Sequence, residues 1–134
     1  MSPAALALVL VFAQAASAAK PAPSPSPTPR VEAPPPYEGD LLRLGELMGA
    51  LAYLRELCHD GDGDEFRAKM ARLIQSDPRP QEAKDQLAGA FNRGFEGYRL
   101  TYRVCTANAR DAIAAHLDET QRLARDVAAR FGGG

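Results

Sequence analysis

The feature that most constrains the fold is a seam of apolar and small residues in the second half of the chain, at alternating spacings of four and three. It consists of Leu87, Phe91, Gly94, Tyr98, Thr101 and Cys105. Side chains three and four positions apart lie on one face of an α-helix, so the spacing predicts a long helix from about Pro80 to Cys105. Aromatic residues concentrate on this face, and we interpret them as core residues, not as a cofactor site.

Three other segments show the same periodicity. We expect a helix from Asp40, as N-cap, to Leu57, and a second from Asp62 or Asp64, as cap, to about Ser76. After a break at Thr106 to Asn108, we expect a last helix that continues to Phe131. Ser76 or Asp77 is the expected cap of the long helix. No segment alternates with the period of two that a strand requires. Short turns between amphipathic helices imply antiparallel neighbours, so the sequence predicts an all-α domain, a small bundle of three to four antiparallel helices.

Two glycines four residues apart, Gly45 and Gly49, lie inside the first expected helix. Glycine in a helix interior costs about 1 kcal/mol relative to alanine. We therefore expect these positions to permit the close approach of another helix.

The first 19 residues have the pattern of a secretory signal peptide. Residues 4–13 form an uncharged apolar run, too short to cross a bilayer core of about 30 Å as a helix. Ala16, Ser17 and Ala18 fit an A-x-A cleavage site, and cleavage after Ala19 fits nearly as well. The pattern predicts a periplasmic or secreted protein with no stable membrane span after cleavage. The alternative is an uncleaved anchor or a buried apolar helix.

Residues 20–39 contain eight of the eleven prolines. Alternating proline removes backbone donors and favours polyproline II, so we expect a disordered linker of up to roughly 60 Å. A ligand for proline-binding modules is the alternative interpretation. The predicted organisation is a signal peptide (1–19), a proline-rich linker (20–39), a helical domain (40–131) and a flexible tail (132–134).

The two cysteines, Cys58 and Cys105, fall at the expected C-terminal ends of two helices. In an exported small domain a pair of cysteines is expected to form a disulfide. A disulfide between them would close a loop of about 47 residues and stabilise the fold by about 4 kcal/mol. A redox role is less favoured because the chain has no C-x-x-C motif.

The charge pattern points to one candidate binding set. The net charge of -1 gives no general attraction to nucleic acid or anionic membranes, so we expect no nucleic-acid partner. Arg93, Arg99, Arg103 and Arg110 outnumber the single acid Glu96 over their stretch. They could bind a carboxylate or phosphate of an envelope polymer or partner protein; alternatively they pair with Glu96 or with the acidic turn.

No motif indicates catalysis, a cofactor or a metal. The helical domain contains one serine, Ser76, and two histidines, His59 and His116, which assemble no triad. Asp60, Asp62 and Asp64 resemble the start of a calcium-binding EF-hand loop, but Glu65 stands where glycine is needed and Ala71 where a bidentate glutamate belongs. We expect a solvated acidic turn there, and His116 at the edge of the bundle.

The runs LGELMGALAYLRELC (44–58), FNRGFEGYRLTYRVCT (91–106) and RLARDVAARF (122–131) give the domain a family resemblance. It resembles a family of small exported alphaproteobacterial proteins known as a domain of unknown function. The resemblance covers residues 41–131 and implies export and the cysteine pair. It implies no activity, substrate or catalytic residue.

The leading functional hypothesis is a non-enzymatic module that binds or scaffolds a protein or polymer of the cell envelope. The alternative is a small enzyme or an accessory factor in cell-wall chemistry, using Arg99, Arg103 and neighbouring carboxylates. A cleft with carboxylates of shifted pKa would favour the enzyme, whereas an exposed apolar patch would favour a binding surface. No motif indicates the partner or the oligomeric state.

Overall fold

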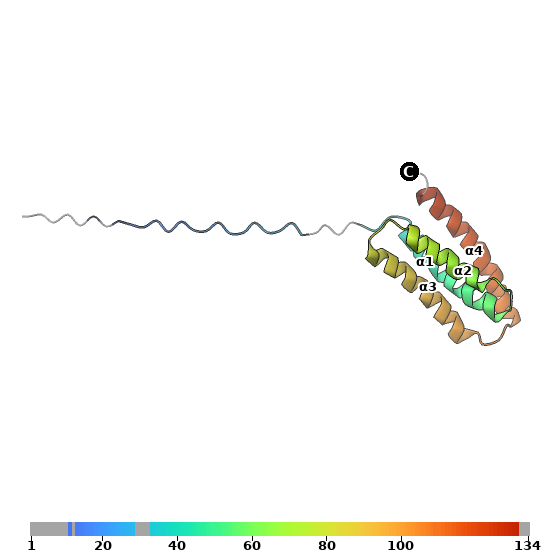
Figure 1. Cartoon of the computed structure of the whole chain (residues 1–134). Coiled ribbons are helices and arrows are strands. Elements are labelled where there is room, and N and C mark those ends of the chain that lie inside the picture. Colours follow the sequence, from blue (N-terminus) through green and yellow to red (C-terminus); the bar gives the residue numbers. More distant parts are fainter. Residues whose placement is uncertain (1–10, 12, 29–32, 132–134) are drawn as a thin grey trace, which may run out of the picture. The chain divides into compact units, whose positions relative to one another are not determined.

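The computed structural model describes residues 11, 13–28 and 33–131, and within them it contains four α-helices and no strand. They are α1 (Glu38–Leu57), α2 (Gly63–Ser76), α3 (Gln81–Thr101) and α4 (Ala107–Phe131), shown in Figure 1. The predicted all-α bundle is confirmed. The chain divides into two units, Met1–Glu32 and Ala33–Gly134.

In the first unit, residues 11 and 13–28 form neither helix nor strand. Most of the expected apolar signal segment (1–10 and 12), part of the expected linker (29–32) and the expected tail (132–134) lie outside the described residues. All four helices belong to the second unit.

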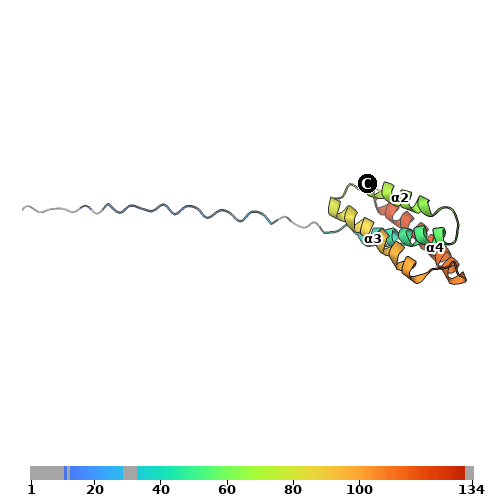
Figure 2. The ribbon, with the colours of Figure 1, turned by 60° about the horizontal axis from the view of Figure 1, so that its bottom comes forward.

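Helix α1 is the centre of the bundle, because α2, α3 and α4 each pack on it. Its buried residues extend around most of the helix instead of forming one stripe, as expected for a helix that three others cover. They are Leu41, Leu44, Gly45, Leu47, Met48, Gly49, Ala50, Leu51, Ala52 and Leu54. Consecutive helices run antiparallel, as expected, so α1 and α3 run parallel. Figure 2 shows the same four helices from a second direction.

Three glycines bring α1 and α3 into close contact. A Cβ atom at Gly94 of α3 would overlap the carbonyl oxygen of Glu46 and lie 2.7 Å from its carbonyl carbon. A Cβ at Gly49 of α1 would likewise overlap the carbonyl oxygen of Phe91, and one at Gly45 would lie 3.0 Å from Leu87 Cδ1. The predicted close approach at Gly45 and Gly49 is therefore confirmed, with α3 as the partner helix.

The end of α3 differs from the sequence prediction. The helix stops at Thr101, four residues before Cys105, because Tyr102 adopts an extended backbone (φ -114°, ψ 118°). The Tyr53 hydroxyl of α1 donates a hydrogen bond to the Tyr102 carbonyl oxygen. The Tyr102 carbonyl, just after the end of the helix, thus has a hydrogen-bond partner outside α3. Arg103 lies in the segment that connects α3 to α4.

The expected helix caps were wrong at two places. Asp40 lies inside α1, which starts at Glu38 after Tyr37. Neither Ser76 nor Asp77 caps α3, which starts after Pro80. Asp77 instead accepts hydrogen bonds from the backbone and side chain of Arg79.

The Arg79 guanidinium joins the α2–α3 connection to the first turn of α1. It lies 2.7 Å from Asp77 Oδ2 and 3.2 Å from Glu38 Oε1. Asp77 is buried, and the hydrogen bond from Arg79 holds its pKa below the usual value. A buried carboxylate is tolerated here because its charge is paired and hydrogen-bonded.

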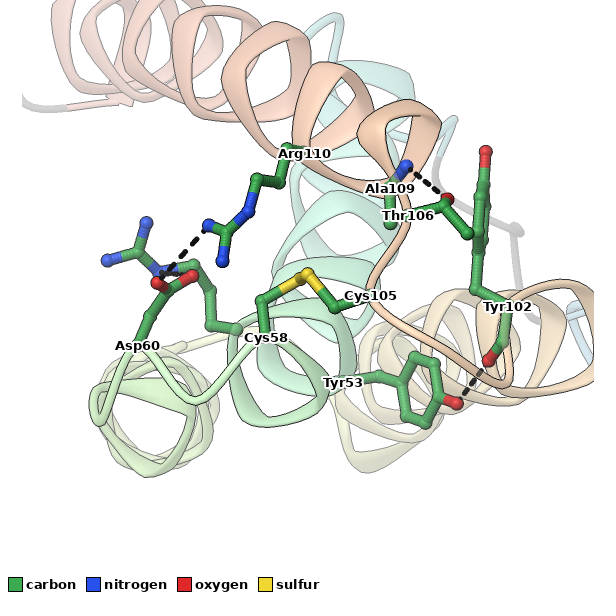
Figure 3. Close-up of a disulfide and its surroundings, with 9 residues drawn as sticks. Tyr53, Cys58, Asp60, Tyr102, Cys105, Thr106, Ala109 and Arg110 are labelled. Carbon is green, nitrogen blue, oxygen red and sulfur yellow. Dashed lines mark hydrogen bonds and ion pairs between the residues drawn. A yellow bond between two sulfur atoms is a disulfide. The ribbon is translucent and has the colours of Figure 1, made fainter.

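The disulfide joins the other end of α1 to the start of α4. Cys58 follows α1 directly, Cys105 lies two residues before α4, and their Cα atoms are 5.0 Å apart. Figure 3 shows the bond beside Tyr53, Tyr102 and the first turn of α4. The Thr106 hydroxyl accepts a hydrogen bond from the Ala109 amide, which caps α4. The predicted Cys58–Cys105 disulfide is thus confirmed.

Candidate functional site

A cluster of polar side chains connects α3 and α4, which both pack on α1. Within the described helices the backbones of α3 and α4 do not pack together, so side chains bridge the space between them. We call Arg43, Glu46, Tyr98, His116 and Glu119 the interhelix cluster. His116 Nε2 of α4 lies 2.5 Å from the Tyr98 hydroxyl of α3, and the two rings meet edge to face.

The charged members of the interhelix cluster connect α1 to α4. Arg43 Nε donates to Glu119 Oε1 at 2.9 Å, and a second guanidinium nitrogen donates to Oε2 at 3.1 Å. Glu46 lies 3.4 Å from the same guanidinium. The hydrogen bonds from Arg43 lower the pKa of Glu119. The lowered pKa of Glu119 therefore follows from its ion pair with Arg43, in which both carboxylate oxygens accept hydrogen bonds.

His116 and Tyr98 are both held in their neutral forms. Burial lowers the pKa of His116, and the Arg43 charge lowers it further. Burial likewise raises the pKa of Tyr98. The Tyr98 hydroxyl and His116 Nε2 share one hydrogen bond, and the tautomer of the imidazole sets which of the two donates. The pair thus serves as an uncharged link between two helices that otherwise meet only through α1.

Acidification is expected to destabilise the domain through His116. A histidine with a lowered folded-state pKa binds more protons when unfolded, so its contribution is present above about pH 6.5 and is lost as pH falls below that value. The His116→Gln variant should show a shallower fall in the free energy of unfolding between about pH 7 and pH 5. Urea denaturation at several pH values measures this.

A second feature lies at the end of α3, where two large apolar side chains are exposed. Leu100 is 64% exposed and Val104 is 68% exposed, and each follows an arginine, Arg99 and Arg103. We call these four residues the α3 tip. The disulfide at Cys105 and the contact from Tyr53 to Tyr102 fix the segment that carries them.

The four arginines selected from the sequence do not form one cluster. Arg99 Nε donates to Glu96 at 2.7 Å on the exposed face of α3. Arg93 is exposed and its guanidinium lies back along α3 toward Gly89. Arg103 is exposed in the α3–α4 connection, so it is not one helical turn from Arg99 on the same helix as expected.

The fourth arginine, Arg110, faces the acidic turn. Its guanidinium lies 3.8 Å from Asp60 Oδ1. Figure 3 marks this ion pair with a dashed line. Arg55 of α1 also contacts this turn, with two hydrogen bonds of 2.7 Å to Asp62 that lower the pKa of that carboxylate. Asp60 and Asp62 thus contact guanidinium groups of α1 and α4, whereas the Asp64 side chain on α2 is 98% exposed and lies near Arg67 of its own helix.

A shallow pocket of about 330 Å³ lies beside the same turn. Its lining residues are Glu56, His59, Gly61, Gly63 and Asp64. Arg67 is within ion-pair distance of both carboxylates, 3.3 Å from Glu56 and 3.5 Å from Asp64. Over the part of the chain that the structure describes, no group of three or more His, Cys, Asp or Glu side chains is placed to hold a metal ion.

Sequence reasoning missed the interhelix cluster. Arg43 and Glu119 are 76 positions apart, and Tyr98 and His116 are 18 apart, so no local spacing relates them. His116 was expected at the edge of the bundle, and it is half-buried between α3 and α4. A single sequence carries no signal for such pairs, because they depend on how α3 and α4 are placed around α1.

Comparisons with known proteins give one match. The family model described as "Protein of unknown function (DUF2385)" matches residues 36–131, which include all four helices. No curated protein and no solved structure matches the chain. Among the helices described, none is both long and apolar enough to span a membrane.

Proposed function

Because the chain belongs to the family described as Protein of unknown function (DUF2385), which brings no activity with it, we propose a function from the structure. We propose that the chain is an exported, non-enzymatic module that binds a partner in the cell envelope through the α3 tip. The proline-rich segment before α1, residues 20–37, acts as its spacer.

The observation that carries this proposal is the exposure of Leu100 and Val104 beside two arginines on a fixed segment. Exposed apolar surface rimmed by polar side chains is typical of contact sites, and Leu100 and Val104 are 64% and 68% exposed. Arg99 and Arg103 add hydrogen-bond donors suited to carboxylate or phosphate groups. The disulfide at Cys105 lowers the entropy lost when such a segment binds.

Export is supported by two independent features. Disulfides form and persist in oxidising compartments, and this chain uses both of its cysteines in one disulfide. The apolar run at residues 4–13, followed by small residues, fits a secretory signal peptide. We therefore propose a periplasmic or secreted location.

The second candidate is a small enzyme or accessory factor in cell-wall chemistry. The interhelix cluster favours it, since Tyr98 and His116 are hydrogen-bonded side chains of types that transfer protons. However, the shifted carboxylate of this cluster, Glu119, is explained by its ion pair with Arg43. The exposed apolar side chains therefore favour the binding module.

In-cell crosslinking of a tagged chain, followed by mass spectrometry, tests the proposal. We expect crosslinks to an envelope component that are lost in the Arg99→Gln, Arg103→Gln double variant. The matched control is Arg122→Gln, Arg125→Gln, which removes the same charge from exposed positions on α4. A chain that stays in the cytoplasm, or crosslinks that are equal in both variants, would contradict the proposal.

A further inference from the structure

Three hydroxyl-bearing side chains alternate with prolines in the spacer before α1. The run at residues 23–29 reads Pro-Ser-Pro-Ser-Pro-Thr-Pro, and its hydroxyls belong to Ser24, Ser26 and Thr28. All three residues are exposed, and they lie in the part of the first unit that forms neither helix nor strand (Figure 1). Among the described residues, no hydrogen bond involves their side chains. The three hydroxyl groups are therefore accessible to an enzyme.

The serine and threonine hydroxyls of the helical domain differ, because each is hydrogen-bonded or buried. Ser76 and Thr101 donate hydrogen bonds to carbonyl oxygens one turn earlier in their own helices, at 3.0 and 2.8 Å. Thr106 caps α4, and Thr120 Oγ1 is shielded from solvent. Beyond residue 20 the chain thus has one accessible set of these hydroxyls, in the spacer, and one occupied set, in the helical domain.

The flanking prolines keep the three hydroxyls apart on an extended backbone. Proline fixes φ and favours polyproline II, which has three residues per turn and a rise of about 3.1 Å per residue. Hydroxyls two positions apart are then separated by about 6 Å along the axis and point to different sides of it. Each can therefore carry a bulky group without crowding the next.

The composition of the run favours a sugar as that group. Serine and threonine residues interspersed with proline are typical of O-glycosylated stalks. A sugar is bulky and strongly hydrated, and this exposed segment has no packing for it to disrupt. Phosphorylation would instead need a nucleoside triphosphate, which is held in the cytoplasm that an exported chain has left.

We propose that Ser24, Ser26 and Thr28 are O-glycosylated. This inference rests on the export that forms part of the proposed function. The co-substrate is a sugar activated as a diphosphate ester of a membrane lipid. The hydroxyl oxygen bonds to the anomeric carbon of the sugar, and the bond from that carbon to the phosphate oxygen breaks. The lipid diphosphate leaves with the electron pair, and the hydroxyl proton passes to solvent.

Mass spectrometry of the chain purified from the envelope or medium of its natural host tests this. Trypsin should release the mature N-terminus as one peptide that ends at Arg30, since proline follows Lys20 and blocks cleavage there. We expect this peptide to exceed its sequence mass by whole sugar residues. Mild alkali, which eliminates sugars from serine and threonine, should release them.

Hydroxyl variants locate the sugars. Each of Ser24→Ala, Ser26→Ala and Thr28→Val should lower the mass excess by one glycan, and the triple variant should have the mass of its sequence. The matched control is Ser76→Ala, Thr101→Val, which removes two hydroxyls of the helical domain and should leave the excess unchanged.

Three outcomes would overturn the glycosylation inference: an exported chain whose peptide to Arg30 has its plain sequence mass, an excess equal to phosphate groups, or an excess that persists in the triple variant. If the exported chain carries no sugar but its crosslinks still depend on the α3 tip, the proposed function stands and only the glycosylation is wrong. If the sugars are present but the crosslinks are absent, the glycosylation stands and the proposed binding is wrong. A chain that stays in the cytoplasm without sugars contradicts both.

Discussion

The Gly94→Ala variant should lose about 3 kcal/mol or more of its free energy of unfolding. The added Cβ would overlap the backbone carbonyl of Glu46, and a backbone group cannot rotate away as a side chain can. The two helices would have to separate at the closest point of the α1–α3 contact. Urea denaturation followed by far-UV circular dichroism measures the loss.

The control for this prediction lies three residues away on the same helix. Gly97 is exposed, and a Cβ built there meets no heavy atom within 4 Å. Gly97→Ala should therefore raise the free energy of unfolding by roughly 0.5 to 1 kcal/mol, through the higher helix propensity of alanine. Equal effects of the two substitutions would show that α3 does not approach α1 at Gly94.

Removing the disulfide should have the second large effect. Cys58 and Cys105 are 47 positions apart, and opening a loop of this length should cost about 4 kcal/mol through the entropy of the unfolded chain. The Cys58→Ala, Cys105→Ala variant should lose this amount in urea denaturation. Reductant should destabilise the wild type similarly and leave the double variant unchanged.

The region that loosens first on reduction should be α4. Within the described residues its backbone packs only on α1, and the disulfide holds its first turn near the end of that helix. Native-state hydrogen exchange should therefore show lost protection in the first turns of α4 before α1 or α3. A reduced chain as stable as the oxidised one would contradict this role of the disulfide.

The sequence predicted well those features that depend on local periodicity. The seam from Leu87 to Thr101 is a helix, and Leu87, Phe91 and Gly94 are buried in it. The pairing of Cys58 with Cys105 followed from there being two cysteines. The close helix contact at Gly45 and Gly49 was also predictable, because glycine is otherwise unfavourable inside a helix.

Features that depend on distant contacts were not predictable. Nothing near Tyr102 indicates that α3 stops there, because the contact comes from Tyr53, 49 positions earlier. Asp77 has the chemistry of a helix cap, but it pairs instead with Arg79, whose guanidinium also binds Glu38 of α1.

The most direct test of an exported, disulfide-stapled module is the intact mass of the chain recovered unreduced from the cell envelope or medium. We predict a chain that begins at Ala19 or Lys20 and is two hydrogen atoms lighter than after reduction. A chain that retains residues 1–19, or one whose mass does not change on reduction because both thiols are free, would contradict the account.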